Sequence, residues 1–236
     1  MKSRFLAFIA IAFILSGCTK NLDLSYFSMD MPAGWDYQPG NGTDSFVGTI
    51  TTSSGTISFE YSTKGYASSL ISTEQQYLSD QKNWATSLCY FCEPGVNYVP
   101  TQDVDTEKKR LASKDTAVVK VEPTIEYTKS IYKPEGIWRK YYPGADYLAE
   151  LRYKDSTIFV PIRIPQSIKK HNLHIDTTAQ FIVKTVSPKV GETGTTGVYY
   201  KSRSTALNFN IKGEELSAED QEKALKAFKT IKLREE

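Results

Sequence analysis

Hydrophobic and polar residues alternate with a period of two along much of the chain. Ile57, Phe59 and Tyr61 alternate with polar residues, and residues 207–211 repeat the pattern. Successive side chains of a strand point to opposite faces, so this alternation is typical of half-buried antiparallel strands. We predict further strands at 26–31, 45–51, 115–122, 179–186 and 196–203.

A hairpin is predicted between residues 147 and 164. Every second residue of 147–153 is apolar, Lys154 and Asp155 form a turn, and residues 158–164 continue the alternation. Pro161 points to the opposite face of the second strand and has no backbone N–H to donate. This strand is therefore expected at the edge of a sheet.

Two helices are expected, at about 73–88 and 218–230. The first begins with Thr73-x-x-Gln76, a capping-box pattern. The second follows Ser217, an N-cap residue, and has acidic residues in its first turn, which the helix dipole favours. A short helical turn is predicted at 165–171.

These elements predict an α+β fold, a mainly antiparallel sheet with two packed helices. Each helix follows a hairpin, and the hairpins share spaced residues such as Gly48 and Gly197, so a duplicated ββα unit is one interpretation. We expect a single domain over 25–236, or two lobes over 25–95 and 96–236.

The first eighteen residues have the pattern of an export signal. Lys2 and Arg4 precede Phe5–Leu15, an uninterrupted apolar run. As a helix this run would rise about 16 Å, roughly half of a bilayer core, so it is too short for a stable span. The run ends in Leu15-Ser16-Gly17-Cys18, which resembles the lipobox of bacterial lipoproteins.

The resemblance to bacterial lipoproteins implies how the chain is anchored. Residues 1–17 would be a cleaved signal peptide, Cys18 would carry diacylglycerol and an amide-linked acyl chain such as palmitate, and 18–24 would be a lipidated tether. More than one lipid chain makes anchoring durable. The expected location is the bacterial cell envelope. In a cell with two membranes, it is the outer membrane, facing the periplasm.

Charge excludes the simplest electrostatic partners. The chain has 29 basic and 27 acidic residues, and Lys2 and Arg4 account for the surplus, so the chain after the signal has 27 of each. A balanced chain offers no basic field for nucleic acid or an anionic membrane surface. We therefore expect no nucleic acid partner and a membrane contact through the lipid.

The segment Phe27–Trp35 resembles the opening strand and Gly-Trp turn of PsbP/Mog1-like domains. That family packs helices on an antiparallel sheet, so the resemblance implies the same architecture. It covers about ten residues and the terminal helix.

Two pairs of potential metal ligands occur with the same spacing. Cys89 and Cys92 are expected to form a disulfide, because an exported pair so close together is easily oxidised. Together with His171 and His174 they could instead supply four zinc ligands or a redox site. A gap of 78 residues separates the pairs, so we favour the disulfide, place the histidines in a loop, partly exposed, and predict no cofactor.

A candidate ligand platform lies where aromatic residues are densest, between 132 and 147. Cations and turn residues are interspersed there, and aromatic rings on turns can stack on sugars or peptides. Trp138 is the largest of these rings. The candidate binding residues are Tyr132, Trp138, Arg139, Tyr141, Tyr142 and Tyr147.

The sequence thus favours a non-catalytic module that binds another envelope protein or a glycan. A serine hydrolase would need one of only two histidines, and no Gly-x-Ser-x-Gly motif is present. Paired carboxylates leave no local signature, so this class of catalysis stays open. The alternative is a metal-dependent or redox protein built on the cysteine and histidine pairs.

Overall fold

The chain divides into two units in the computed structural model, which describes residues 19–80, 97–99, 119–121, 129–153 and 156–234. Unit 1 combines the residues up to Ile71 with Lys170–Glu236, and unit 2 is Ser72–Lys169. This division differs from both arrangements expected from the sequence. The reason is long-range strand pairing, which joins the two ends of the chain into one unit and leaves the middle as an insertion.

A seven-stranded antiparallel sheet forms the framework of unit 1. Its strands are β3 (Asp36–Pro39), β4 (Phe46–Thr51), β5 (Thr56–Ser62), β11 (His171–Thr177), β12 (Phe181–Pro188), β13 (Thr195–Ser202) and β14 (Asn208–Glu214). They are ordered β11-β12-β13-β14-β5-β4-β3. The pairing of β14 with β5 sets Phe209 opposite Tyr61 and Ile211 opposite Phe59. The apolar residues of these two predicted strands therefore lie next to each other on the same face of the sheet.

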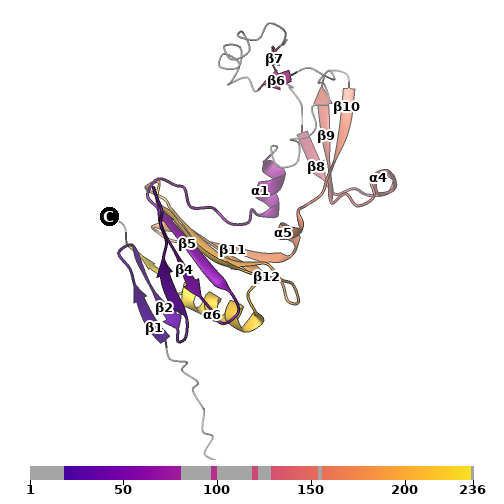
Figure 1. Cartoon of the computed structure of the whole chain (residues 1–236). Coiled ribbons are helices and arrows are strands. Elements are labelled where there is room, and N and C mark those ends of the chain that lie inside the picture. The colour runs from indigo at the N-terminus through magenta and orange to yellow at the C-terminus, as the bar shows by residue number, and fades with distance from the viewer. Residues whose placement is uncertain (1–18, 81–96, 100–118, 122–128, 154–155, 235–236) are drawn as a thin grey trace, which may run out of the picture. The chain divides into compact units, whose positions relative to one another are not determined.

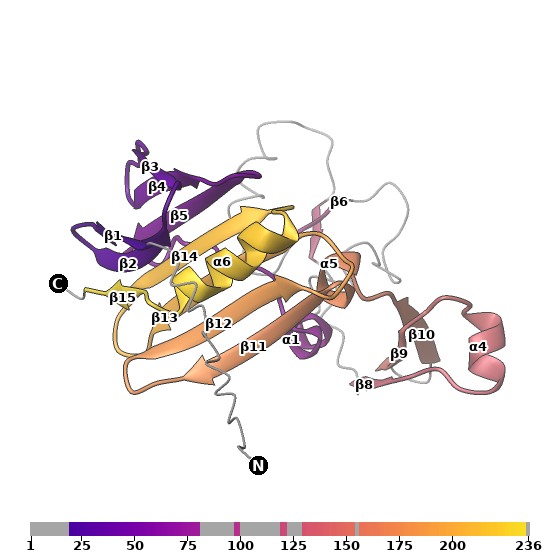
Figure 2. The same ribbon diagram turned by 90° about the horizontal axis from the view of Figure 1, so that it is seen from below.

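One face of this sheet is covered by a small sheet and a helix. Figure 2 shows α6 (Ala218–Phe228) beside β1 (Thr19–Asp23), β2 (Phe27–Pro32) and β15 (Lys232–Leu233) over the sheet. The ring of Phe27 lies 5.0 Å from that of Phe59 and 4.8 Å from that of Phe209. The core of unit 1 is therefore rich in aromatic rings, and the alternating residues Ile57, Phe59, Tyr61, Phe209 and Ile211 all belong to it.

Residues 19–23 were expected to be part of a tether but form the strand β1. β1 pairs with β2, and the Leu22 side chain is buried in the core. A leucine and the pairing groups of the backbone are enough to hold this short segment on the neighbouring strand.

The opposite face is crossed by the segment from Gly65 to Ile71, here called the strap. Asn208 of β14 accepts a hydrogen bond from the Ala67 N–H at 3.0 Å and donates one to the Ala67 carbonyl at 3.1 Å. Lys184 of β12 donates to the Ile71 carbonyl at 2.9 Å, and burial lowers the pKa of Lys184. The expectation of a half-buried β14 was thus wrong, because the strap buries the polar face as well.

Removing the strap contact should be measurable. Asn208→Ala leaves the N–H and C=O of Ala67 without their partners, so we expect a loss of about 2 kcal/mol in the free energy of unfolding. Asn210→Ala is the matched control, because its side chain donates a single bond, to the Ser68 carbonyl at 3.0 Å, and should cost about half as much. Urea denaturation measures both, and equal losses would contradict the assigned role of Asn208.

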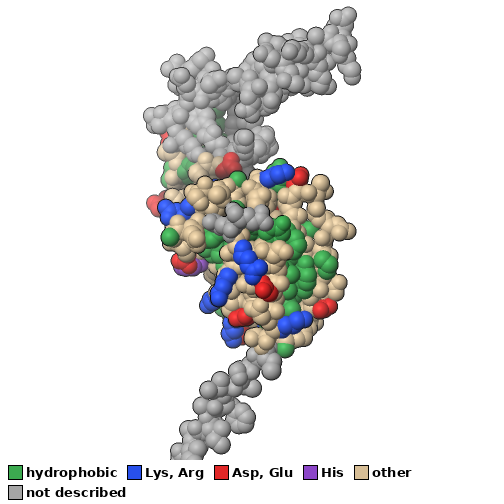
Figure 3. Space-filling view, turned by 90° about the vertical axis from the view of Figure 1, so that its left-hand side faces the viewer, with side chains coloured by type: hydrophobic (Ala, Val, Ile, Leu, Met, Phe, Trp, Pro, Cys, Tyr) green, Lys and Arg blue, Asp and Glu red, His purple; other side chains and the backbone are tan. Residues whose placement is uncertain are grey.

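Charges on unit 1 are mixed. Figure 3 shows Lys and Arg side chains interspersed with Asp and Glu on the face drawn. Ion pairs of unit 1 include Lys64 with Asp44 at 3.1 Å and Lys170 with Glu192 at 3.0 Å. The face drawn therefore has no field of a single sign, as the balanced composition indicated.

The described residues of unit 2 include a three-stranded antiparallel sheet and the short helices α1, α4 and α5 (Figure 1). Its elements are α1 (Glu74–Ser79), β6 (Asn97–Val99), β7 (Val119–Val121), β8 (Lys129–Tyr132), α4 (Ile137–Tyr141), β9 (Tyr147–Tyr153), β10 (Ser156–Ile162) and α5 (Gln166–Lys169). The predicted hairpin is confirmed as β9 and β10, and β10 lies at the sheet edge as Pro161 indicated. β6 and β7 form a separate parallel pair.

The predicted helices are confirmed in part. The capping box of Thr73 and Gln76 is present and Ser217 caps α6, but α1 ends at Ser79. Asp80 has extended backbone angles, and Ser79 bonds the Gln76 carbonyl, which competes with helix continuation. The rest of the helix predicted to residue 88 lies outside the described residues. α5 matches the predicted turn at 165–171.

The structure shows an antiparallel sheet with few helices, not the duplicated ββα unit. The two hairpins that suggested it, β4–β5 and β13–β14, share one sheet with β5 next to β14. α6 packs on the sheet, whereas the helix after β5, α1, belongs to unit 2. The described helices therefore do not occupy equivalent places.

Candidate binding pocket

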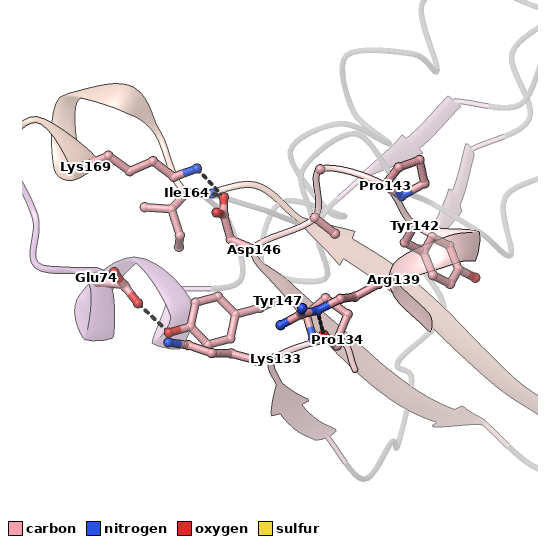
Figure 4. A pocket seen from close by; sticks show the side chains of 12 residues that line it. Glu74, Lys133, Pro134, Arg139, Tyr142, Pro143, Asp146, Tyr147, Ile164 and Lys169 are labelled. Carbon is pink, nitrogen blue, oxygen red and sulfur yellow. Dashed lines mark hydrogen bonds and ion pairs between the residues drawn. The ribbon is translucent and has the colours of Figure 1, made fainter. Parts of the chain in front are cut away.

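A cavity of about 630 Å³ lies within unit 2. Figure 4 shows its side chains converging from α1, from the turn after β8, from α4, from the start of β9 and from α5. The lining residues are Glu74, Lys133, Pro134, Arg139, Tyr142, Pro143, Gly144, Ala145, Asp146, Tyr147, Ile164 and Lys169. This volume is within the range of small-molecule sites.

The turns that flank α4 bring its residues to the cavity. α4 ends at Tyr141 and is capped by Tyr142, whose backbone N–H donates to the Trp138 carbonyl. Gly144 follows with a φ of +81°, a left-handed conformation that glycine adopts at little cost. This turn reverses the chain into β9, so Tyr142 and Tyr147 both reach the lining.

Asp146 is held by hydrogen bonds on one side of the cavity. Its Oδ2 accepts from the Ile164 N–H at 2.8 Å and from Lys169 Nζ at 2.6 Å. Burial by itself would raise the pKa of Asp146, but the bonds from Lys169 and Ile164 and the charge of Arg163 outweigh it and lower that pKa. Asp146 is therefore ionised and its charge is compensated by Lys169.

Glu74 and Tyr147 form a second internal pair. The Tyr147 hydroxyl donates a close hydrogen bond to Glu74 Oε1. This bond, together with burial and the charge of Glu74, raises the pKa of Tyr147 to about 12. Tyr147 is therefore a neutral donor that orients the carboxylate. Lys133 Nζ lies 5.7 Å from the centre of the Tyr147 ring, a cation–π distance.

Arg139 reaches the cavity from α4. Its Nε donates to the Pro134 carbonyl at 3.0 Å, and Figure 4 shows the side chain extending back from α4 toward Pro134. The bond fixes the direction of the guanidinium and leaves its terminal N–H groups for other acceptors. Within the described part of the chain, neither Arg139 nor Lys133 forms an ion pair with a carboxylate.

The structure brings half of the predicted platform to the cavity. Arg139, Tyr142 and Tyr147 line it, whereas Tyr132, Trp138 and Tyr141 do not. The Trp138 ring packs 4.4 Å from the ring of Phe159 on β10 and 6.2 Å from that of Tyr142. Trp138 thus supports the wall of the cavity from behind.

This support predicts a stability effect for Trp138. Trp138→Ala removes a half-buried ring that holds α4 against β10, so we expect unit 2 to lose about 2 kcal/mol of stability. Tyr141→Ala is the matched control, since the Tyr141 side chain is 65% exposed and should change stability by less than about 0.5 kcal/mol. Thermal unfolding compares them, and an unchanged midpoint for Trp138→Ala would show that its packing is unimportant.

Sequence reasoning missed four charged residues of the lining: Glu74, Lys133, Asp146 and Lys169. Lys133 lies within the aromatic stretch, but nothing in the sequence distinguishes it from the other cations there. Glu74 and Lys169 flank that stretch from distant positions. Only folding brings them together, so no local pattern could have identified them.

A smaller cavity of about 380 Å³ lies in unit 1 and includes Tyr26, Asp44 and Lys64. Asp44 and Lys64 pair with each other, and Ser45 donates to Glu60 at 2.9 Å. Its charged groups are thus compensated within the fold. The cavity in unit 2 is the better candidate for a ligand.

The histidines do not form the site that the alternative required. They lie in the strand β11 and not in a loop, and positions three apart in a strand point to opposite faces. His171 is buried and its Nε2 accepts from the Thr195 N–H at 2.8 Å, whereas His174 is exposed beside Asp176. The two imidazoles therefore cannot bind one ion together.

The cysteines of that alternative, Cys89 and Cys92, lie outside the described residues, as does Cys18. Among the residues that are described, no group of three or more His, Cys, Asp or Glu side chains could hold a metal ion. The disulfide and the lipidation stay predictions.

Comparisons with known proteins give no family. No protein-family model and no curated protein matches the chain in sequence. Of the helices in the described segments, none has the length and hydrophobicity needed to span a bilayer.

Proposed function

We propose that this chain is a lipid-anchored protein of the bacterial cell envelope that binds another envelope component, a protein or a glycan, without catalysis. The observation that carries the binding role is the cavity in unit 2. Its aromatic and charged lining combines shape with a few oriented polar groups, as ligand sites do. The leader ending in Leu15-Ser16-Gly17-Cys18 supports the anchoring role.

The position of β1 adds a consequence to the anchoring proposal. β1 begins at Thr19, the residue after Cys18. A lipid on Cys18 would therefore be followed directly by an ordered strand, and unit 1 would lie close to the membrane surface. This differs from the tether of several residues that the sequence suggested.

Lipidation is tested by Cys18→Ser expressed in a bacterium. We expect the variant to take up no labelled palmitate and to leave the membrane fraction, because Cys18 supplies the only sulfur that the lipobox can modify. Cys89→Ser is the matched control and should remain lipidated. Continued labelling of Cys18→Ser would refute the anchoring proposal.

Binding is tested by placing a photo-crosslinking amino acid at Pro143, which lines the cavity, and in a second strain at Val190, which is fully exposed in unit 1. Irradiation of living cells should give a defined adduct from position 143 and not from position 190. The same adducts at both positions, or none at 143, would refute the binding role of the pocket.

A further inference from the structure

The acidic groups of the unit 2 cavity are already compensated. Glu74 accepts the hydrogen bond of Tyr147, and Asp146 accepts from Ile164 N–H and Lys169 Nζ. Both carboxylates are thus engaged with groups of the protein. They are poorly placed to recognise a cationic ligand, which would have to displace these donors.

The remaining charges of the lining are two cations. Lys133 and Arg139 both line the cavity, and neither has a carboxylate partner in the described chain. The bond from Arg139 Nε to the Pro134 carbonyl aims the guanidinium before any ligand arrives. An oriented guanidinium with a nearby ammonium is well suited to bind an oxyanion through paired, charge-assisted hydrogen bonds.

The net charge of the lining favours one class of oxyanion over another. The lining has three cations, Lys133, Arg139 and Lys169, against the two acids Glu74 and Asp146, which gives a formal net charge of +1. A single carboxylate neutralises this charge. A phosphate dianion would exceed it and would face the two carboxylates in the same cavity, so a carboxylate is the better match.

The rest of the lining favours a saccharide over a peptide as the bearer of that carboxylate. Seven of the twelve lining residues carry polar or charged side chains, and the aliphatic members are Pro134, Pro143, Ala145 and Ile164. None of these four is a long apolar side chain except Ile164, so an apolar peptide side chain would find few partners. The half-buried rings of Tyr142 and Tyr147 offer flat faces beside hydrogen-bonding groups, which suits a sugar ring.

We infer that the unit 2 cavity binds a carboxylated saccharide, with Lys133 and Arg139 pairing with its carboxylate and the tyrosine rings contacting its ring. The inference rests on the proposed binding function and specifies its ligand class. A glycan of the envelope that carries uronic acid or another carboxylated sugar has this chemistry.

The experiment titrates the full exported protein with D-glucuronate up to tens of millimolar, followed by NMR. Glucose, alanylalanine and inorganic phosphate are titrated in parallel. We expect saturable shifts at the lining residues with glucuronate. The affinity for each of the other compounds should be at least about tenfold lower. The double variant Lys133→Gln and Arg139→Gln should lose at least about tenfold in affinity.

Two further variants control for a general charge effect and for loss of stability in the double variant. Lys189→Gln removes an exposed cation of unit 1 and should leave binding unchanged. Arg139→Lys retains the charge but not the planar fork, so it should weaken binding even if the double variant is too unstable to be measured.

Absence of saturable shifts with glucuronate overturns the inference. Equal binding of glucose, or unchanged binding by Arg139→Lys and the double variant, overturns the role of the carboxylate. Stronger binding of alanylalanine or phosphate shows a peptide or phosphate site instead. These outcomes differ from failure of the proposed function, which is the absence of a crosslink at position 143 in cells.

Discussion

Replacing Asp220 with alanine is expected to lower the free energy of unfolding of unit 1 by about 3 kcal/mol. Asp220 lies in the first turn of α6 and is fully buried. Its carboxylate accepts from the Ser54 N–H at 2.8 Å, from Ser54 Oγ at 2.6 Å and from Ser53 Oγ at 2.9 Å. The substitution leaves these donors unsatisfied and separates the β4–β5 turn from the helix.

Glu222→Ala is the matched control on the same helix. Glu222 is exposed and forms an i,i+4 ion pair with Lys226 at 2.7 Å, so its loss should leave the free energy of unfolding nearly unchanged. Urea denaturation of both variants provides the comparison. Equal effects would mean that the buried network around Asp220 contributes no more than a surface pair.

The same network makes stability depend on pH. Burial by itself would raise the pKa of Asp220, but hydrogen bonds from Ser54, Thr52 and Ser53 outweigh it and lower the pKa to about 2. Since this pKa lies below the ordinary 3.8, the contribution is fully present above about pH 4 and is lost as the pH falls toward 2. The stability difference between wild type and Asp220→Ala should shrink by about 2 kcal/mol over that range.

Replacing Phe209 with alanine is expected to cost unit 1 about 3–5 kcal/mol. Phe209 is fully buried, and its ring contacts those of Phe27 at 4.8 Å, Tyr200 at 6.1 Å and Phe59 at 6.4 Å. The substitution leaves a cavity where the small sheet meets the large one. The lost ring contacts and the cavity both lower the free energy of unfolding.

Phe209→Leu keeps a large apolar side chain and removes the aromatic ring. It should lower the free energy of unfolding by less than about 2 kcal/mol. Denaturation monitored by amide exchange assigns the loss to unit 1, because only its amides should exchange faster. A loss below about 1 kcal/mol for Phe209→Ala would contradict the central place of this ring in the core.

The candidate site was predictable only where its residues are close in sequence. The aromatic stretch gave Arg139, Tyr142 and Tyr147 as binding residues, and all three line the cavity. Trp138 has the same sequence signal but packs on Phe159, because the direction of a side chain on a five-residue helix depends on the strand behind it. Pattern alone cannot separate a lining residue from its support.

The sequence by itself determined the local elements of this protein: the period-two strands, the β9–β10 hairpin with its edge proline, and the caps of α1 and α6. These depend on residues within a few positions of each other, so local chemistry is sufficient. Tertiary structure alone decided that β14 pairs with β5, that the strap buries the polar face of β14, and that Glu74 and Lys169 join Arg139 around one cavity. Those contacts join segments tens to more than a hundred residues apart, and their partners are selected by burial and hydrogen-bond satisfaction across the whole fold, which no local pattern records.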